Sequence, residues 1–380
     1  MILVDLAFEP EDEATLPALT LVMPMKTEHG WLYHQFGRAG AVAETENRRG
    51  PLKGDADVST HFWLGTPNEG LTFFTPSQEN WGNAKSPHVK LEGPVTNYTV
   101  SIAADSYRVR KGMTLRFGFI ATPVRPMRDN WRFFRCKRDW SYNWFGAMHN
   151  SNNHVTKMNP RFPQYLKRVH QTVPLHVVYI RPDWMNLAED ETSYYREEWK
   201  SEPWRLCGTD GGGVPGENRH IRVCLGSDWQ DFLLYHEMKI IDAADGDGFY
   251  HDGADPVHCT NRHHDHSYRG PDGKTRGTYA LLDYRRYYKR LAVEMSKRRP
   301  NWQNYLIWLH QSNHFNVPAF SFANMGWDGE QFSTAACATL DYTRLMTAEY
   351  FLAEFHGKQF GYPVQWLLEF VKPVTPRDAD

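Results

Sequence analysis

Residues 220–252 read HIRVCLGSDWQDFLLYHEMKIIDAADGDGFYHD and combine two strand-like runs with a helical segment. The runs at 220–225 and 248–252 are short and apolar, as buried strands are. The segment 228–244 between them places apolar side chains close to one helical face: Phe232, Leu233, Met238, Ile240 and Ile241. A strand, a helix and a second strand in this order predict parallel strands joined by a helical crossover.

The same alternation extends over the rest of the chain after residue 125. Further strand-like runs lie at 174–180, 305–310, 319–323 and 363–367, with a candidate at 142–147, and helical patterns lie at 281–299 and 340–356. A parallel α/β barrel needs eight strands to close. We therefore predict a TIM-like (β/α)8 barrel domain over residues 126–380, either with a strand hidden near the C-terminus or incomplete.

The first 125 residues carry a different pattern. Short runs rich in β-branched and aromatic residues, bounded by Gly, Pro or Asn, lie at 61–64, 71–74, 96–103 and 114–122. A sustained helical period is absent from this part of the sequence. We predict an antiparallel β-sandwich domain over residues 1–125, with a Pro-containing hinge at 123–131.

Charge and hydropathy exclude two classes of partner. The 43 Lys and Arg against 45 Asp and Glu give a formal net charge of −2, which provides no general attraction to nucleic acid. The sequence contains no run of about 18 apolar residues, so we expect no membrane insertion. Its first residues, MILVDLAFEPEDEA, show no export signal, and the localisation stays unassigned.

Aromatic residues are abundant: 14 Trp, 19 Tyr and 21 Phe make up 14% of the chain. Such rings combine a flat apolar face with a polar edge, so they either line a pocket for sugars or fill a large core. The five Cys residues are too few and too scattered to predict a disulfide framework.

Asp252 is the first candidate catalytic residue, because it ends the strand at 248–252. Side chains at the carboxyl ends of barrel strands face the active-site mouth. Asp252 would then act as nucleophile or as stabiliser of the transition state, unless it only caps the next turn. Glu330, in the segment WDGEQ, would lie over the same mouth as general acid/base, or it begins a helix. Two converging carboxylates are the minimum equipment for glycosidic cleavage.

Other polar and aromatic residues near the predicted strand ends are candidates for binding the sugar: Tyr250, His251, Asn261, His264, Tyr268, His310 and Trp327. The loop after Asp252 also offers imidazole and thiol ligands for zinc: His251, His258, Cys259, His263, His264 and His266. Because no pair among them has a recognised ligand spacing, we assign no metal ligand and expect no cofactor.

Four segments resemble glycoside hydrolase family 123-like proteins. They are HFWLGTPNEGLTFFTPSQENW (61–81), LRFGFIATPVRP (115–126), DGFYHDGADPVHCTNRHHDHSY (247–268) and HQSNHFNVPAFSFANMGWDGEQF (310–332). The resemblance covers most of the chain. Within the third segment, five residues keep the family pattern: Asp252, Cys259, Asn261, His264 and Tyr268. Asp265 and His266 depart from it.

The resemblance implies a β-sandwich followed by a (β/α)8 barrel, and an oligosaccharide or glycan as substrate. Characterised members are β-N-acetylgalactosaminidases that use an adjacent Asp-Glu pair and the 2-acetamido group of the substrate. Here the adjacent pairs, Asp12-Glu13 and Asp190-Glu191, lie away from the predicted strand ends. What carries over is the fold, the substrate class and the Asp252 region. The resemblance further implies relatives that are usually exported, to the periplasm or outside the cell, and that extend further at the N-terminus.

Two readings from other classes remain open at this point. One is a non-catalytic carbohydrate-binding protein on the same scaffold, favoured by the lack of an Asp-Glu pair at a strand end. The other is a metal-dependent hydrolase that uses the His-rich loop.

Overall fold

The computed structural model of the 380-residue chain describes residues 1–35, 38–42, 61–82, 88–103, 106–143, 155–203, 206–207, 220–270, 272–312, 316–332 and 346–367. The chain divides into two compact units. Unit 1 comprises 1–126, 312–318 and 328–380, and unit 2 comprises 127–311 and 319–327. Residues 312–318 and 328–380, which we expected in the barrel domain, thus group with the N-terminal part of the chain.

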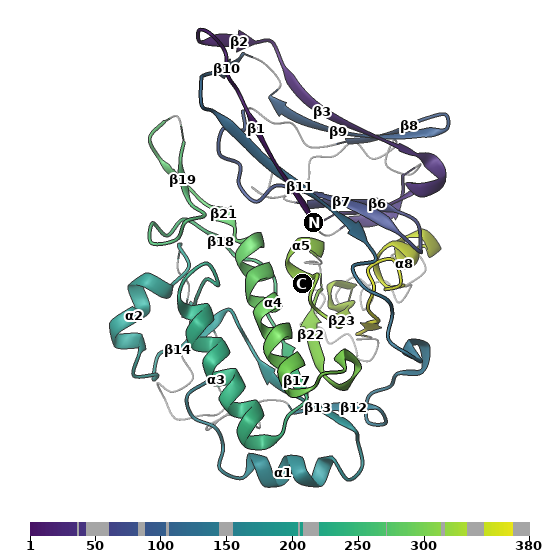
Figure 1. Cartoon of the computed structure of the whole chain (residues 1–380), viewed down its shortest axis with the longest axis vertical. Coiled ribbons are helices and arrows are strands. Elements are labelled where there is room, and N and C mark those ends of the chain that lie inside the picture. The colour runs from purple at the N-terminus through teal and green to yellow at the C-terminus, as the bar shows by residue number, and fades with distance from the viewer. Residues whose placement is uncertain are drawn as a thin grey trace, which may run out of the picture. The chain divides into compact units, whose positions relative to one another are not determined.

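Unit 1 is built from antiparallel sheets (Figure 1). Six strands form the larger sheet, in the order β1 (Ile2–Ala7), β11 (Thr114–Thr122), β7 (Gly70–Phe74), β6 (His61–Gly65), β4 (Leu32–Gln35) and β5 (Arg38–Ala41). Three strands form a second sheet, in the order β3 (Leu19–Lys26), β9 (Val95–Ala103) and β8 (His88–Glu92). A short pair joins β2 (Ala14–Leu16) to β10 (Tyr107–Val109).

The two larger sheets of unit 1 pack face to face. Burial alternates along β9 with a period of two, as expected for a strand with one face in the core. One apolar cluster takes residues from both sheets: Phe62, Leu64, Phe73 and Phe117 from the larger one, and Tyr98 and Val100 from the smaller. This is the architecture of a β-sandwich.

Three elements near the C-terminus complete unit 1 among the residues described: η6 (Glu330–Phe332), α8 (Ala348–Glu354) and β24 (Val364–Trp366). Thr347 caps α8, since its hydroxyl oxygen accepts a hydrogen bond from the Tyr350 backbone N–H. α8 packs against β4 and β5. The first part of the helix predicted at 340–356 lies outside the described residues.

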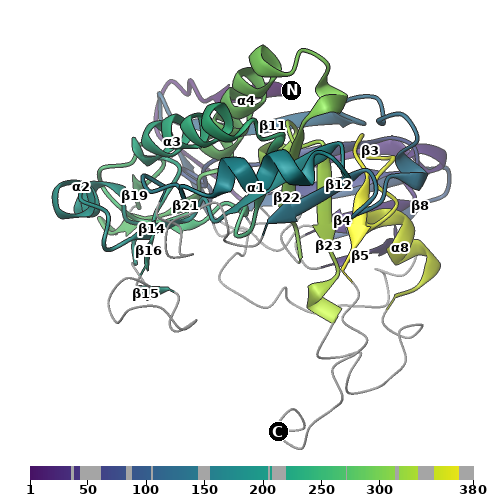
Figure 2. The ribbon, with the colours of Figure 1, turned by 90° about the horizontal axis from the view of Figure 1, so that it is seen from below.

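The parallel sheet has six strands in the order β12 (Trp140–Asn143), β13 (Leu175–Ile180), β17 (Gly248–His251), β22 (Leu306–His310), β23 (Met325–Asp328) and β24, and its first five strands form the centre of unit 2. The helices α1 (Phe162–Val169) and α4 (Leu281–Arg298) both contact α3 (Trp229–Ala244), and both views show the three together (Figures 1 and 2). Within the described part of unit 2 this sheet is a parallel half-barrel rather than a ring of eight strands.

Two of the predicted barrel strands were wrong. The run at 220–225 supplies β16 (His220–Arg222), which pairs antiparallel with β14 (Trp184–Asn186) and β15 (Leu206–Cys207). The run at 319–323 overlaps the short helix α5 (Val317–Phe320), and the strand follows it as β23. Both errors have one physical cause. A short apolar run indicates a buried segment, but it does not show whether that segment is a parallel strand, an antiparallel strand or a helix.

The remaining elements of unit 2 are short. The helix α2 (Thr192–Trp199) lies between β14 and β15 in the chain, and these two strands belong to the β14–β16–β15 sheet. Two small antiparallel pairs follow β17, namely β18 (His258–Cys259) with β21 (Thr278–Tyr279), and β19 (Tyr268–Arg269) with β20 (Thr275–Arg276). Among the described residues, no helix has the length and apolar character needed to cross a bilayer.

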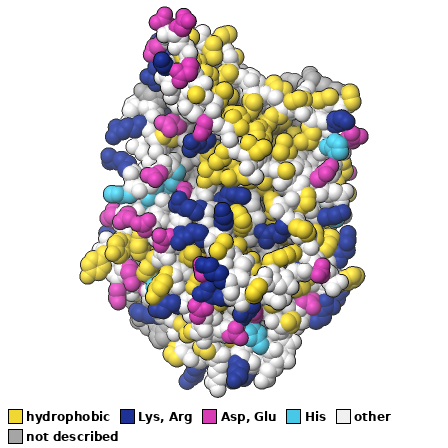
Figure 3. Space-filling model, in the orientation of Figure 1, with side chains coloured by type: hydrophobic (Ala, Val, Ile, Leu, Met, Phe, Trp, Pro, Cys, Tyr) yellow, Lys and Arg dark blue, Asp and Glu magenta, His cyan; other side chains and the backbone are white. Residues whose placement is uncertain are grey.

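The outer surface shows one apolar feature, on strand β1. β1 lies at the edge of the larger sheet of unit 1, and its Ile2, Leu3 and Leu6 are exposed. Hydrophobic side chains gather over this part of the face drawn in Figure 3.

Candidate active site

The register of the parallel sheet brings four side chains into one row at the carboxyl ends of the strands. The Asp252 backbone N–H, just after β17, donates to the Ile180 carbonyl at 3.1 Å, which places Asp252 beside Arg181 at the end of β13. His310, the last residue of β22, is in register with Trp327 of β23. Because the ends of parallel strands meet at one edge, this row is where an α/β sheet carries its chemistry.

Asp252 is held by hydrogen-bond donors from β13 and its end. The Tyr179 hydroxyl donates to Asp252 Oδ2 at 2.5 Å, and Arg181 Nη1 donates to the same oxygen at 3.1 Å. His310 Nδ1 lies 3.9 Å from the other oxygen, Oδ1. The Asp252 side chain remains 20% exposed. Asp252 is thus a partly exposed carboxyl group with two hydrogen-bond donors on one oxygen.

The Asp252 carboxylate in turn affects the pKa values of its two donors. Burial raises the pKa of Tyr179, and the neighbouring Asp252 charge raises it further, so the phenol stays protonated and remains a donor. Burial alone would lower the pKa of Arg181, but Asp183 and Asp252 outweigh it and raise the pKa.

Arg181 belongs to a chain of alternating charges. Its Nε lies 3.2 Å from Asp183 Oδ1, and Arg222 Nε lies 3.2 Å from Asp183 Oδ2. Arg222 also approaches Asp255 at 3.8 Å. Gly253, with φ +67°, leaves room for this network, because a Cβ there would lie 2.4 Å from Arg181 Nη2 and from Asp183 Oδ1.

Aromatic rings form the sheet face beneath the row. The Tyr250 ring lies 4.1 Å from that of Trp308 and 5.2 Å from that of Trp327, centroid to centroid, and Trp308 stacks on Trp327 at 4.7 Å. The Tyr250 hydroxyl and His310 Nδ1 are hydrogen-bonded at 2.7 Å. Tyr250 and Trp308 are buried, whereas Trp327 is half-buried and is the ring of this group that can meet the apolar face of a sugar.

Three predicted sugar-binding residues, Tyr250, His310 and Trp327, therefore lie with Asp252, but His251 does not. Side chains alternate along a strand, so His251 points to the opposite face from Tyr250. There it is fully buried, with Nε2 2.9 Å from Glu237 Oε1 of α3, and Tyr287 of α4 donates to the same carboxylate. These contacts favour a role in attaching the helices to the sheet.

Asn261, His264 and Tyr268 lie further along the loop. Asn261 is buried, and its amide nitrogen donates to the carbonyls of Glu197 and Lys200 at 3.0 and 2.9 Å, at the end of α2. Its Oδ1 accepts from the His263 backbone N–H. His264 is buried as well, whereas Tyr268 is half-buried in β19. The contacts of Asn261 favour a structural role.

Glu330 begins η6 in unit 1 and is exposed, and its backbone N–H donates to the Ser312 hydroxyl at 3.2 Å. Since Asp252 belongs to unit 2, the predicted meeting of these two carboxylates stays a prediction. The adjacent pairs Asp12-Glu13 and Asp190-Glu191 lie just before β2 and α2.

Tyr179 and Arg181 are the site residues that our sequence reasoning missed. The signal was present, because the run at 174–180 ends in Tyr-Ile and is followed by Arg-Pro-Asp. The strand-end argument that selected Asp252 would have selected Arg181 too.

Unit 1 contains a second group of polar residues, which is interior. Asp328 and Glu354 are 1% and 2% exposed, and the Gln331 amide nitrogen donates to both, at 2.9 and 3.2 Å. Burial raises the pKa of Glu354 to about 7 and that of Asp328 well above its ordinary value. His34, 3.6 Å from Glu354, is kept neutral because burial lowers its pKa to about 4. Without exposure, this group has no route to a substrate.

A surface pocket in unit 2 lies at the opposite ends of the strands. It is lined by residues that precede β12, β13 and β22, among them Phe133, Arg138, Leu175 and Gln303. Since the amino ends of parallel strands carry stability rather than chemistry in barrel enzymes, we do not assign the active site there.

No family model and no curated protein matches the chain. Solved structures that resemble it include an α-galactosidase from Lactobacillus brevis, with 11% identity over 92% of this chain and 54% of that one and a TM-score of 0.41. An α-galactosidase from Thermus thermophilus, solved with p-nitrophenyl α-D-galactopyranoside, has 12% identity over 99% and 90% and a TM-score of 0.39. A family GH31 sulfoquinovosidase from E. rectale has 11% identity over 86% and 56% and a TM-score of 0.42.

All three proteins are glycoside hydrolases, and the chain spans about half the length of the first. Solved glycoside hydrolases are thus among the structures that resemble this chain. At these TM-scores and identities, the activity of the chain has to come from its own residues.

Proposed function

We propose that the chain is a glycoside hydrolase in which Asp252 is the catalytic carboxylate. One observation carries the proposal: Asp252 follows β17 at the carboxyl edge of the parallel sheet, partly exposed, and accepts hydrogen bonds from Tyr179 and Arg181. The strand-end position is the one from which α/β sheets present catalytic groups.

The two donors suggest how the carboxylate would work. Both bond to Oδ2, so we propose that Oδ1 faces the anomeric carbon. Cleavage of a glycosidic bond passes through a transition state with positive charge on the sugar ring, and an ionised carboxylate stabilises that charge or forms a covalent intermediate.

Neighbouring side chains would bind the sugar itself. The Trp327 ring supplies an apolar platform, and His310, whose Nδ1 is hydrogen-bonded with the Tyr250 hydroxyl, lies beside the carboxylate. Glu330 remains our proposed general acid/base on sequence grounds.

The test is hydrolysis by the full chain of a panel of nitrophenyl glycosides and oligosaccharides, with and without a 2-acetamido group. For an active substrate we expect D252N to lower kcat/KM by about 10³-fold or more while the circular dichroism spectrum is unchanged. D272N is the matched control, because Asp272 is exposed in the β19–β20 turn, where it accepts from the Lys274 backbone N–H and pairs with Arg276. Full activity in D252N would remove Asp252 from the mechanism.

The acetamido arm of the panel tests the specificity that the family resemblance suggests. Turnover restricted to 2-acetamido sugars would support a substrate-assisted reaction. E330Q tests the proposed acid/base separately, and we expect its loss of rate to be smallest for substrates with the best leaving group, which need least protonation.

A non-catalytic carbohydrate-binding protein is the second candidate, and the ion pair between Arg181 and Asp252 favours it, since a neutralised carboxylate is a weaker nucleophile. Calorimetry with the same oligosaccharides, beside a reducing-sugar assay, separates the two functions. Binding with no turnover of any substrate would support the second.

A further inference from the structure

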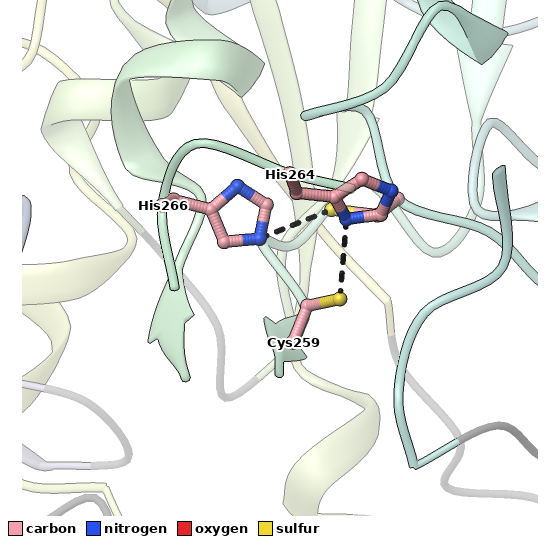
Figure 4. A group of neighbouring side chains, drawn as sticks. Cys259, His264 and His266 are labelled. Carbon is pink, nitrogen blue, oxygen red and sulfur yellow. Dashed lines mark hydrogen bonds between the residues drawn. The ribbon is translucent and has the colours of Figure 1, made fainter. Parts of the chain in front are cut away.

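Four side chains with metal-binding atoms converge in unit 2, at a place that the proposed function does not use. Cys224 lies between β16 and α3, Cys259 ends β18, and His264 and His266 follow in the next loop. One ligand atom from each lies within 4.8 Å of all the others. Figure 4 shows both imidazole rings turned toward the sulfur atoms.

Two separations between the ligand atoms match the edges of a tetrahedral site. Cys259 Sγ lies 3.3 Å from His264 Nδ1, and Cys224 Sγ lies 3.7 Å from His266 Nε2. With Zn–S near 2.3 Å and Zn–N near 2.0–2.1 Å, the edges of a tetrahedral Cys₂His₂ site measure about 3.3–3.8 Å. Zinc would thus replace two side-chain hydrogen bonds with only small displacements.

The second nitrogen of each imidazole faces an oxygen atom. His264 Nε2 is hydrogen-bonded with the Glu198 carbonyl oxygen of α2 at 2.7 Å, and His266 Nδ1 lies 3.5 Å from Asp283 Oδ2 of α4 without a hydrogen bond. A histidine that binds a metal usually donates its other N–H to a carbonyl or a carboxylate. The bond of His264 Nε2 leaves the lone pair of its Nδ1 for the sulfur atom, and Asp283 is placed to become the acceptor of His266.

The sulfur atoms are surrounded by backbone donors. The Gly226 N–H donates to Cys224 Sγ at 3.3 Å, and the N–H groups of Glu202 and Asn261 donate to Cys259 Sγ at 3.3 and 3.4 Å. Such donors stabilise the thiolate form that a metal requires. Gly226 also makes room for the imidazole, because a Cβ there would lie 2.4 Å from His266 Cε1.

We propose that Cys224, Cys259, His264 and His266 bind one Zn²⁺ ion in a closed structural site. Four protein ligands complete a tetrahedron and leave no position for a substrate, and both cysteines and His264 are buried. The site ties the start of α4 and the end of α2 to the loop that begins directly after Asp252. Sequence reasoning assigned no metal because the fourth ligand, Cys224, stands 35 residues before Cys259.

Metal content is the first test. The full chain, dialysed against zinc and then against metal-free buffer, should hold about one Zn²⁺ per chain by elemental analysis. C259S and H264Q should hold less than about 0.2. The controls C136S and H258Q remove a half-buried thiol and an exposed imidazole outside the cluster and should retain the ion. Cobalt in place of zinc should give thiolate charge-transfer and tetrahedral absorption bands.

A thermal-stability measurement on the wild-type chain tests the proposal even if the variants fail to fold. Free zinc should raise its melting temperature in a concentration-dependent manner, and a chelator should reverse the gain. D283N, which leaves all four ligands in place, should weaken zinc binding about 10–100-fold, whereas D272N should not. A folded wild type that holds no zinc, ligand variants that keep it, or an intact mass lowered by two hydrogens, which indicates a Cys224–Cys259 disulfide, would each overturn the proposal.

Discussion

The two units compensate their carboxylates in opposite ways. In unit 2, Asp183 and Asp252 are balanced by the guanidinium groups of Arg181 and Arg222. In unit 1, Asp328 and Glu354 lie together in the interior, and burial raises the pKa of both. Asp252, which pairs with Arg181 and is 20% exposed, can meet a substrate, whereas the carboxyl groups of Asp328 and Glu354 are enclosed.

The strongest test of this contrast removes a cation from unit 2. R181Q leaves Asp183 fully buried with only Arg222 beside it, and breaking one side of a buried ion pair typically costs about 3–5 kcal/mol. We expect the free energy of unfolding, measured by urea titration, to fall by about that amount. R276Q, which breaks an exposed pair, should change it by less than about 0.5 kcal/mol. Equal effects of the two substitutions would contradict the network described here.

The stability of unit 1 should instead depend on pH. Glu354 has a pKa near 7 in the folded chain against an ordinary value of 4.5, so the folded state binds a proton that the unfolded state releases in this window. Its contribution therefore makes the fold less stable as pH rises from about 4.5 to about 7. His34 acts in the opposite sense between about pH 4 and 6.5, because its folded pKa is lowered.

E354Q isolates the Glu354 contribution, since His34, Asp328, Gln331 and Tyr350 remain. As the pH rises from 5 to 8, we expect the unfolding free energy of E354Q to increase by about 2 kcal/mol relative to that of the wild type. Urea titrations at both pH values measure it. A difference that does not change with pH would show that Glu354 is ionised in the fold.

The smallest effect expected is that of Y250F, which removes the hydrogen bond to His310 and keeps the ring in its stack. Stability should change by about 1 kcal/mol or less. Because His310 would lose its orientation, we expect kcat/KM on an active glycoside to fall about tenfold with the pH profile shifted. A fall in stability with unchanged kinetics would assign this pair to packing alone.

The periodicity of apolar residues along the sequence was sufficient to predict many of the strands. The runs at 61–64, 71–74, 96–103 and 114–122 correspond to β6, β7, β9 and β11, and those at 174–180, 248–252 and 305–310 to β13, β17 and β22. These patterns do not show which strands pair with one another. The apolar run at 220–225 supplies β16, which lies outside the parallel sheet, whereas the run at 363–367 supplies β24, the last strand of that sheet.

Position along a single strand was sufficient to place some candidate residues, whose roles stay predictions. Asp252 follows β17, His310 ends β22 and Trp327 stands next to last in β23, and the three lie in one row. His251 was misplaced because neighbours on a strand face opposite ways. The convergence of Cys224 with Cys259 and the two histidines depends on how the loop folds back, which no local spacing encodes.

Unit 1 is assembled from three separate stretches of chain, and the polypeptide passes between the units after Pro126, Gln311, Pro318 and Trp327. Within unit 1, the His34 side chain of β4 rests against Glu354, which is translated 320 residues later. During synthesis the early strands must therefore wait, with part of their interior uncovered, until residue 354 has been synthesised. Protection by chaperones on the ribosome should matter more for this protein than for one whose domains are contiguous in the gene.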